Sequence, residues 1–322
     1  MTISNRLSRG GDRGQRRKAT LGGAAVALGA LAIWVADRAR RAELSHPPRG
    51  ALLTVDGVRL HYLERGQGTP VVLLHGNVVH AEDFVVSGLI DRLAAQHRVI
   101  AFDRPGFGHS ARPRDRLWTA AAQAALLDRA LAQLGVEHAV VLGHSWGTLV
   151  ALELALRAYT RVRKLVLVSG YYFPTARADV VLAAPPAIPV VGDVMRYTLS
   201  PVFARVMLKK TIQAMFTPQV VPADFLPVLG RELLVRPSQI RANAEDAAFM
   251  IPAAARLRKR YGELKTPTTI FAGETDPVVD PERHARRLHT ELSNSELHVL
   301  PGVGHMLHHA APGAVVAAVG AG

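Results

Sequence analysis

The residues best placed to do chemistry begin with a serine in the sequence G-H-S-W-G at positions 143–147. An apolar run at 139–142 ends directly before it, and a helical pattern starts directly after it. On a strained turn between a strand and a helix, a serine side chain is exposed, and glycines on both sides avoid collisions there. The pattern predicts Ser145 as a nucleophile, with Gly143 and Gly147 as supporting residues. The alternative is an ordinary glycine-rich turn.

A serine hydroxyl attacks only when a base removes its proton, so a histidine is required. The chain has 14 histidines, and His305 is the best placed. It ends the glycine-rich stretch P-G-V-G-H at 301–305, directly after an apolar run at 297–300. His308 and His309 follow at helical spacing and could be read with it as a metal cluster. No acidic or cysteine ligand accompanies them in the sequence, so we expect no metal.

A carboxylate must hold the histidine in the correct tautomer. Asp276 stands in the loop after an apolar run at 268–271, between Ser145 and His305 in the chain. The order serine, acid, histidine is that of one known group of triads. Glu274 is a rival two positions earlier. Asp280 is a weaker rival, because Asp280-Pro281 has the form of a helix N-cap.

The developing oxyanion also needs fixed hydrogen-bond donors. The sequence H-G-N, formed by His75, Gly76 and Asn77, follows an apolar run at 70–74. We expect the backbone N–H groups of Asn77 and Trp146 to be the two donors. Gly76 would allow close approach of the backbone, and His75 is expected to be structural.

These motifs require a sheet that brings its strand ends together. Continuous apolar runs indicate strands that are buried on both faces, and helical patterns alternate with them, which predicts a mostly parallel sheet. A hairpin across Asp56-Gly57 precedes it. The expected strands are 51–56, 58–64, 70–74, 99–102, 139–142, 165–168, 268–271 and 297–300, and the expected helices are 82–96, 118–134, 146–157 and 281–292.

The alternation stops at 171–265, which holds ten of the 20 prolines. Prolines at helix starts divide such a stretch into short helices. We expect a helical lid inserted between two strands of the sheet. Its large apolar side chains could line an acyl pocket or simply pack the lid, and they are Tyr171, Tyr172, Phe173, Met195, Phe203, Met207, Met215, Phe216, Phe225, Phe249 and Met250.

Together, residues 51–320 resemble the lidded α/β-hydrolase superfamily, the group of esterases, lipases and thioesterases. The sequence D-R-P-G-F-G-H-S at 103–110 strengthens the likeness, since members often carry such a turn. The resemblance implies an α/β fold with a mostly parallel eight-stranded sheet. Related epoxide hydrolases and haloalkane dehalogenases have an aspartate at the position of Ser145 and a proline at that of Val78. A serine there implies acyl transfer through an ester intermediate.

The net charge of +13 could suggest nucleic acid, but its distribution favours another partner. Residues 1–50 hold ten lysines and arginines against three acidic residues, which leaves only +6 for the rest. Basic residues that flank one apolar segment are typical of a membrane anchor. We therefore expect no nucleic-acid partner, and we take the residual charge as a solvated surface. The absence of cysteine excludes disulfides and thiolate nucleophiles.

No charged residue occurs at 19–36, a length of about 27 Å in a helix, which just spans a hydrocarbon core. We expect a basic tail at 1–18, a transmembrane anchor at 19–36, a linker at 37–50 and the hydrolase domain at 51–322. Six basic residues before the segment and four after it favour a cytoplasmic N-terminus and an extracytoplasmic domain. A cleaved signal peptide and a twin-arginine signal are the alternatives.

The sequence thus predicts a serine hydrolase that cleaves an ester or related acyl bond of a small, apolar substrate, with no cofactor. Alternatives that use the same triad are C–C bond hydrolysis, acyl transfer and cofactor-free perhydrolysis. A ligand-binding protein that kept only the fold is a further alternative.

Overall fold

The computed structural model describes residues 8–176 and 184–320. One sheet of eight strands forms its centre, in the order β1-β2-β4-β3-β5-β6-β7-β8. β1 and β2 make an antiparallel hairpin, β2 pairs antiparallel with β4, and all other neighbours are parallel. The strands are β1 (Ala51–Val55), β2 (Val58–Arg65), β3 (Thr69–Leu74), β4 (His97–Phe102), β5 (Ala139–His144), β6 (Val162–Val168), β7 (Thr268–Gly273) and β8 (Ser295–Leu300). The predicted mostly parallel, eight-stranded α/β sheet is confirmed.

Both faces of the central strands are buried, which explains their continuous apolar runs. In β5, Val141 belongs to the hydrophobic core on one face of the sheet, and Val140 and Leu142 belong to the core on the other face. Helices α4 (Ala120–Gln133) and α5 (Gly147–Arg157) cover the first face, while α3 (Leu89–Ala94) and α14 (Pro312–Gly320) cover the second. The sheet is thus the middle layer of three, and its carboxyl-end loops hold the site.

Two expected helices differ from the structure. The helix predicted at 82–96 is two short helices, α2 (Asp83–Val86) and α3, because Gly88 between them adopts a φ of 70°. Helical hydrogen bonding cannot continue through this left-handed conformation. The helix predicted at 281–292 begins with a wider π-type turn at Glu282–Arg286 before α12 (Arg287–Glu291).

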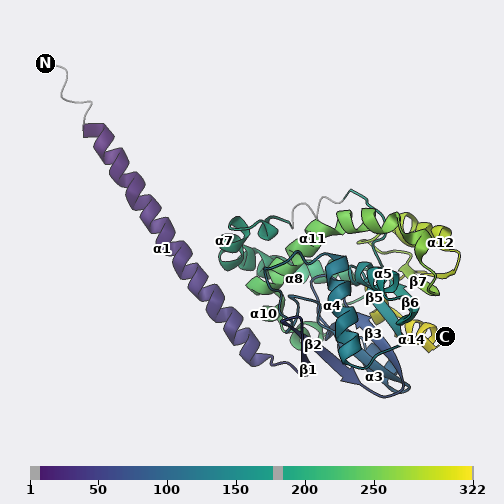
Figure 1. Ribbon diagram of the computed structural model, residues 1–322. Coiled ribbons are helices and arrows are strands. Elements are labelled where there is room, and N and C mark those ends of the chain that lie inside the picture. Colours follow the sequence, from purple (N-terminus) through teal and green to yellow (C-terminus); the bar gives the residue numbers. More distant parts are fainter. Residues whose placement is uncertain (1–7, 177–183, 321–322) are drawn as a thin grey trace.

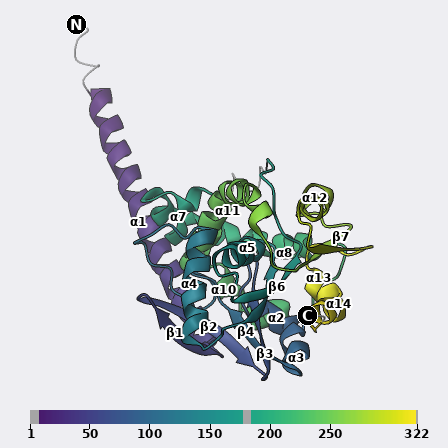
Figure 2. The same ribbon diagram turned by 45° about the vertical axis from the view of Figure 1, so that its right-hand side comes forward.

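Between β6 and β7 the described residues hold helices and no strand, as expected for 171–265, and α7 and α11 lie above the strands in Figures 1 and 2. The longest, α11, contacts α5. Part of the predicted lid, 177–183, lies outside the described residues. The helices are α7 (Val191–Tyr197), α8 (Leu199–Phe216), α9 (Phe225–Leu229), α10 (Arg231–Leu234) and α11 (Pro237–Arg258), with short turns at Pro185–Ala187 and Tyr261–Glu263.

The N-terminal helix α1 (Ser8–Ser45) projects from the body as a rod (Figure 1). Within it, 18–45 is long and apolar enough to cross a membrane by length and composition. The helix continues through most of the predicted linker, and its last turns pack on α7, α10 and α11. Val35 and Ala42 are buried there, and Trp34 lies under the guanidinium of Arg205 at 4.9 Å. The first seven residues of the predicted tail are outside the described part.

Candidate active site

Ser145 stands on the turn that joins β5 to α5, as predicted, with a φ of 52°. A β-carbon on Gly143 would lie 2.8 Å from the backbone of Thr148, and one on Gly147 would lie 2.3 Å from the carbonyl oxygen of Leu74. Both distances are too short for any side chain. The glycines are therefore required by the close approach of neighbouring backbone, and they allow the strained conformation of the serine.

The structure brings together the three predicted triad residues. His305 Nε2 lies 2.9 Å from Ser145 Oγ, and His305 Nδ1 lies 2.8 Å from Asp276 Oδ2. The other oxygen of Asp276 accepts the backbone N–H groups of Val278 and Val279 at 2.8 and 2.9 Å, so the carboxylate is fixed. The side chains of Asp276 and His305 are 1% and 2% exposed, which keeps competing water away from their hydrogen bond.

The two rival acids lie elsewhere. Glu274 is exposed at the surface. Asp280 accepts the backbone N–H groups of Glu282 and Arg283, which makes it the helix cap that its sequence context indicates. Neither contacts His305 among the described residues.

The loop that carries the predicted oxyanion donors lies against the serine. A β-carbon on Gly76 would come within 3.0 Å of the Ser145 Cβ. The backbone N–H groups of Asn77 and Trp146 donate to no other group in the described part of the chain. Two free donors beside a serine hydroxyl are what a developing oxyanion needs.

His75, which was predicted to be structural, is fully buried and has both ring nitrogens engaged. Its Nδ1 lies 2.7 Å from the carbonyl oxygen of Gly76, and its Nε2 accepts the backbone N–H of Arg104 at 2.9 Å. Burial, helped by the nearby charge of Arg104, lowers the pKa of His75 to about 3. The neutral imidazole therefore fastens two loops together and has no proton-transfer partner.

Arg104 is a component of the site that the sequence analysis did not select. It lies two residues past the end of β4, and its side chain is fully buried. Its guanidinium donates to the carbonyl oxygens of His75 and Gly76, and to Asn77 Oδ1 at 3.0 Å. Arg104 thus holds all three residues of the predicted oxyanion loop.

The counterion of Arg104 comes from the predicted lid segment. Asp246, on α11, is fully buried and lies 2.5 Å from Arg104 Nη1. Its second carboxylate oxygen accepts from Arg112 at 3.0 Å, and its backbone carbonyl accepts the indole N–H of Trp146 at 2.8 Å. One lid residue therefore connects the elements that carry both predicted oxyanion donors. No local sequence pattern marks it.

No acidic residue stands near His308 and His309 in the sequence, but the fold brings Asp83 into contact with both. Asp83 is 225 positions from His308 in the sequence. Its Oδ2 nevertheless lies 2.8 Å from His308 Nε2, and its Oδ1 lies 2.7 Å from His309 Nε2. Although burial opposes ionisation, the two histidines hold the pKa of Asp83 well below its usual range. Burial lowers the pKa of His308, so it donates as a neutral ring. The three residues form a hydrogen-bonded cluster behind the site.

An apolar pocket of about 500 Å³ lies between α8 and α11, helices of the predicted lid segment, and meets the loop after β3 at Val78. Val78, which follows Asn77, is part of its wall and is fixed by hydrogen bonds with Asn243 and Gln239 of α11. Of the predicted pocket residues, Met195, Phe203 and Met207 line it. Others are packed in the core instead, namely Tyr171, Tyr172, Phe173, Met215, Phe216, Phe225 and Met250. Phe249 lines a separate surface pocket.

Comparison with known proteins relates the chain to several hydrolases. The chain is 26% identical over 273 residues to haloalkane dehalogenase 2 of Mycobacterium tuberculosis, covering 81% of this chain and 90% of that protein. It is also 26% identical over 270 residues to 2-hydroxymuconate semialdehyde hydrolase of Pseudomonas putida, covering 80% and 88%. The fold matches that of an esterase from Exiguobacterium antarcticum with a TM-score of 0.69 at 21% identity, covering 84% and 97%.

The family model of the alpha/beta hydrolase fold matches residues 69–312. This span contains every residue of the predicted triad and oxyanion loop, together with the lid helices. The chain therefore belongs to the alpha/beta hydrolase fold family and is a hydrolase.

Proposed function

We propose that this hydrolase cleaves carboxylic esters through an acyl-enzyme intermediate. The hydrogen-bonded chain from Asp276 through His305 to Ser145 is the observation that carries the proposal. His305 takes the hydroxyl proton as Ser145 Oγ attacks the ester carbonyl, and then returns it to the leaving alcohol. The amides of Asn77 and Trp146 stabilise the oxyanion. Water, activated by the same histidine, then releases the acid.

The apolar pocket favours an acyl group without charge. Its wall is built by Met195, Phe203, Met207 and Val78, and a volume of about 500 Å³ is within the usual range for small-molecule sites. Each buried methylene contributes about 0.8 kcal/mol, so medium-length acyl chains are expected to react better than acetate.

A series of p-nitrophenyl esters from acetate to dodecanoate tests this proposal on the full chain in detergent. We expect kcat/KM to rise with chain length to a maximum, and Ser145→Ala to abolish turnover. A fluorophosphonate reagent is expected to label the folded wild type at Ser145. Absence of both labelling and turnover in folded protein would refute catalysis and favour a ligand-binding role.

C–C bond hydrolysis is the second candidate, and the likeness to 2-hydroxymuconate semialdehyde hydrolase over 80% of the chain favours it. The same serine could attack a ketone carbonyl, with a stabilised carbanion as the leaving group. Turnover of 2-hydroxymuconate semialdehyde, followed by loss of its visible absorbance, separates the two. Ester turnover without this activity excludes the candidate. The dehalogenase likeness carries less weight, because Ser145 stands where an aspartate is expected in that group.

We also propose that α1 anchors the protein in a membrane, with residues 51–322 as the catalytic domain and 171–265 as its lid. Only 6% of the most apolar window of α1 is buried in the protein, which is unlike a core helix. Carbonate washing of membranes is the test, and the protein should stay in the pellet. Release by carbonate would contradict the anchor. Protease protection of the domain in sealed vesicles tests the predicted extracytoplasmic side.

A further inference from the structure

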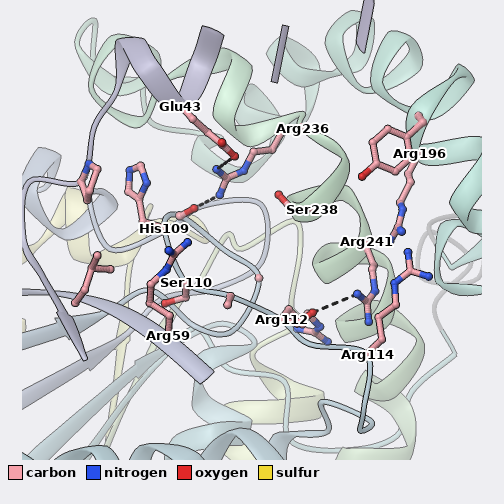
Figure 3. Close-up of a pocket in the computed structure, with 16 residues that line it drawn as sticks. Glu43, Arg59, His109, Ser110, Arg112, Arg114, Arg196, Arg236, Ser238 and Arg241 are labelled. Carbon is pink, nitrogen blue, oxygen red and sulfur yellow. Dashed lines mark hydrogen bonds and ion pairs between the residues drawn. The ribbon is translucent and has the colours of Figure 1, made fainter. Parts of the chain in front are cut away.

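A second pocket, of about 520 Å³, is lined by an unusual number of cations. It lies between the 106–112 loop, the start of α11, α7 and the end of α1, and Figure 3 shows its side chains. Glu43 is the sole carboxylate among its lining residues. Six arginines face it, namely Arg59, Arg112, Arg114, Arg196, Arg236 and Arg241. The basic excess outside the N-terminal region, expected to be a solvated surface, is partly gathered in this pocket.

Two of these arginines are deeply buried and keep an unused donor. Arg196 and Arg236 are each 5% exposed, and the Nε of each has no hydrogen-bond partner in the described residues. Arg236 is held at its other end by Glu43, at 2.9 Å, and by the carbonyl oxygen of Gly108. Burying a guanidinium with an unsatisfied N–H has a cost. Because both Nε atoms are themselves buried, these two arginines offer a ligand in the pocket their positive charge rather than a free Nε donor.

A third arginine is entirely free for a ligand. Arg59 projects from β2 at the rim of the pocket, and its guanidinium makes no hydrogen bond or ion pair with any described group. His109, on the same wall, is neutral at pH 7, because burial lowers its pKa to about 4. The positive charge of the pocket therefore comes from its guanidinium groups.

The remaining arginines of the pocket are held in place by carboxylates. Glu245 accepts from both Arg112 and Arg241 at 2.6 Å. Asp193 forms a paired contact with Arg114 at 2.8 Å. It also contacts Arg196 at 2.6 Å. These carboxylates, with Asp103 and Asp246 deeper in the wall, offset much of the charge. They hold the guanidinium groups in place, so the pocket is a built site rather than a loose basic surface.

We propose that this pocket binds a phosphate-bearing anion, at a site separate from the catalytic serine. Phosphate oxygens accept two parallel N–H donors from a guanidinium, and arginine is the preferred residue for such recognition. Arg59, whose guanidinium has no partner among the described residues, is the principal ligand, and Arg236 and Arg196 contribute positive charge to the wall. The volume accommodates a phosphate monoester or a headgroup, and it lies within the normal range for small ligands.

The place of the pocket leaves two sources for the phosphate. Glu43 and Pro48 belong to the wall, and Glu43 is seven residues beyond the apolar segment that ends at Ala36, about 10 Å along a helix. The headgroup layer of a bilayer is roughly 5–8 Å thick on each side. If α1 is an anchor, a phospholipid headgroup lies close to the pocket. A soluble phosphate ester has the same chemistry.

Calorimetric titration of the full chain in a nonionic detergent tests the site. The ligands are inorganic pyrophosphate, dihexanoyl phosphatidylglycerol below its micelle concentration, and the zwitterionic dihexanoyl phosphatidylcholine. The variants are Arg59→Gln and Arg236→Gln, with Arg92→Gln, an exposed arginine on α3 outside the pocket, as the matched control. Arg59 has no partner to lose, so its variant should fold normally even where loss of the Glu43 pair weakens Arg236→Gln.

We expect saturable binding of at least one anionic ligand, weakened at least tenfold by Arg59→Gln and Arg236→Gln and unchanged by Arg92→Gln. Tighter binding of phosphatidylglycerol than of pyrophosphate identifies a headgroup site, and the reverse order identifies a soluble phosphate ester. The proposal is overturned if neither anion binds saturably, or if Arg59→Gln binds as tightly as the wild type. Binding is measured without turnover, so its outcome is independent of the ester assay.

Discussion

Replacing Asp246 by asparagine removes a buried charge on which two arginines depend, while it keeps the size of the side chain. The carboxylate is fully buried, with one oxygen 2.5 Å from Arg104 and the other 3.0 Å from Arg112. Arg104 is also fully buried, so it cannot reach water when its counterion is lost. The amide NH₂ group of asparagine would also face the guanidinium N–H groups of Arg104 or Arg112, which are donors themselves.

Removing one partner of a buried ion pair costs about 3–5 kcal/mol of folding free energy, since it leaves an uncompensated charge. For a domain of this size, each kcal/mol corresponds to roughly 2–4 °C in melting temperature, so we expect Asp246→Asn to melt about 6–20 °C lower. Arg104 positions Asn77, and a shift of about 1 Å in a catalytic group lowers turnover by on the order of a hundredfold. We therefore expect kcat to fall by roughly tenfold to a hundredfold with KM less affected.

Thermal melting by circular dichroism and p-nitrophenyl ester kinetics on the same preparations measure both effects. Asp91→Asn is the matched control, because its pair with Arg65 is exposed on both sides and is worth less than about 1 kcal/mol. If Asp246→Asn melts within 2 °C of this control, the buried pair contributes little. If it is destabilised yet retains full kcat, Arg104 does not position the oxyanion loop.

Three further substitutions test the site. Asp276→Asn should lower kcat by about 10³ to 10⁴ through the wrong tautomer of His305, and ester kinetics showing less than a tenfold loss would assign the acid elsewhere. Burial lowers the pKa of His75 to about 3, against about 6.5 in the unfolded chain, so the unfolded chain binds a proton that the folded protein does not between these values. The free energy of unfolding is therefore unaffected by His75 above pH 6.5 and falls by up to about 1.4 kcal/mol per pH unit as pH is lowered toward 3. Urea unfolding of His75→Gln should therefore depend less on pH in this window than the wild type, and equal slopes would contradict the argument. Gly147→Ala should cost more than about 2 kcal/mol, because its β-carbon meets a carbonyl oxygen at 2.3 Å, while Gly313→Ala, with open space around it, should be neutral in the same unfolding assay.

The sheet, and the meeting of Ser145, Asp276 and His305, were predictable largely because their determinants are local. A run such as 139–142 needs burial on both faces wherever it lies, and the glycines around Ser145 report a backbone constraint at that position. Chain order then separated His305 from the other histidines, and loop position separated Asp276 from Glu274. The inferences on Ser145 and on the strands use residues within a few positions of one another, whereas the choice of His305 also uses the order of the motifs along the chain.

The residues that were missed meet only through tertiary packing. Asp246 is 142 positions from Arg104, and Asp83 is 225 positions from His308. Neither acid lies in a motif, and a buried ion pair leaves no periodic trace in sequence. The split of the predicted 82–96 helix had a visible cause in Gly88, but a single glycine is often tolerated within a helix.

The contacts of α11 also limit how the lid can move. Through Asp246, Asn243 and Gln239 this helix holds Arg104 and Val78, which fix the loop of the proposed oxyanion donors. Separating α11 from the sheet would break the buried ion pair, and a cost of about 3–5 kcal/mol would hold such open states below roughly one part in a hundred. By contrast, α8 presents exposed apolar side chains, among them Phe203 and Val206, and borders the apolar pocket. Substrate entry is therefore expected to involve displacement of α7 and α8, with α11 remaining as part of the catalytic framework.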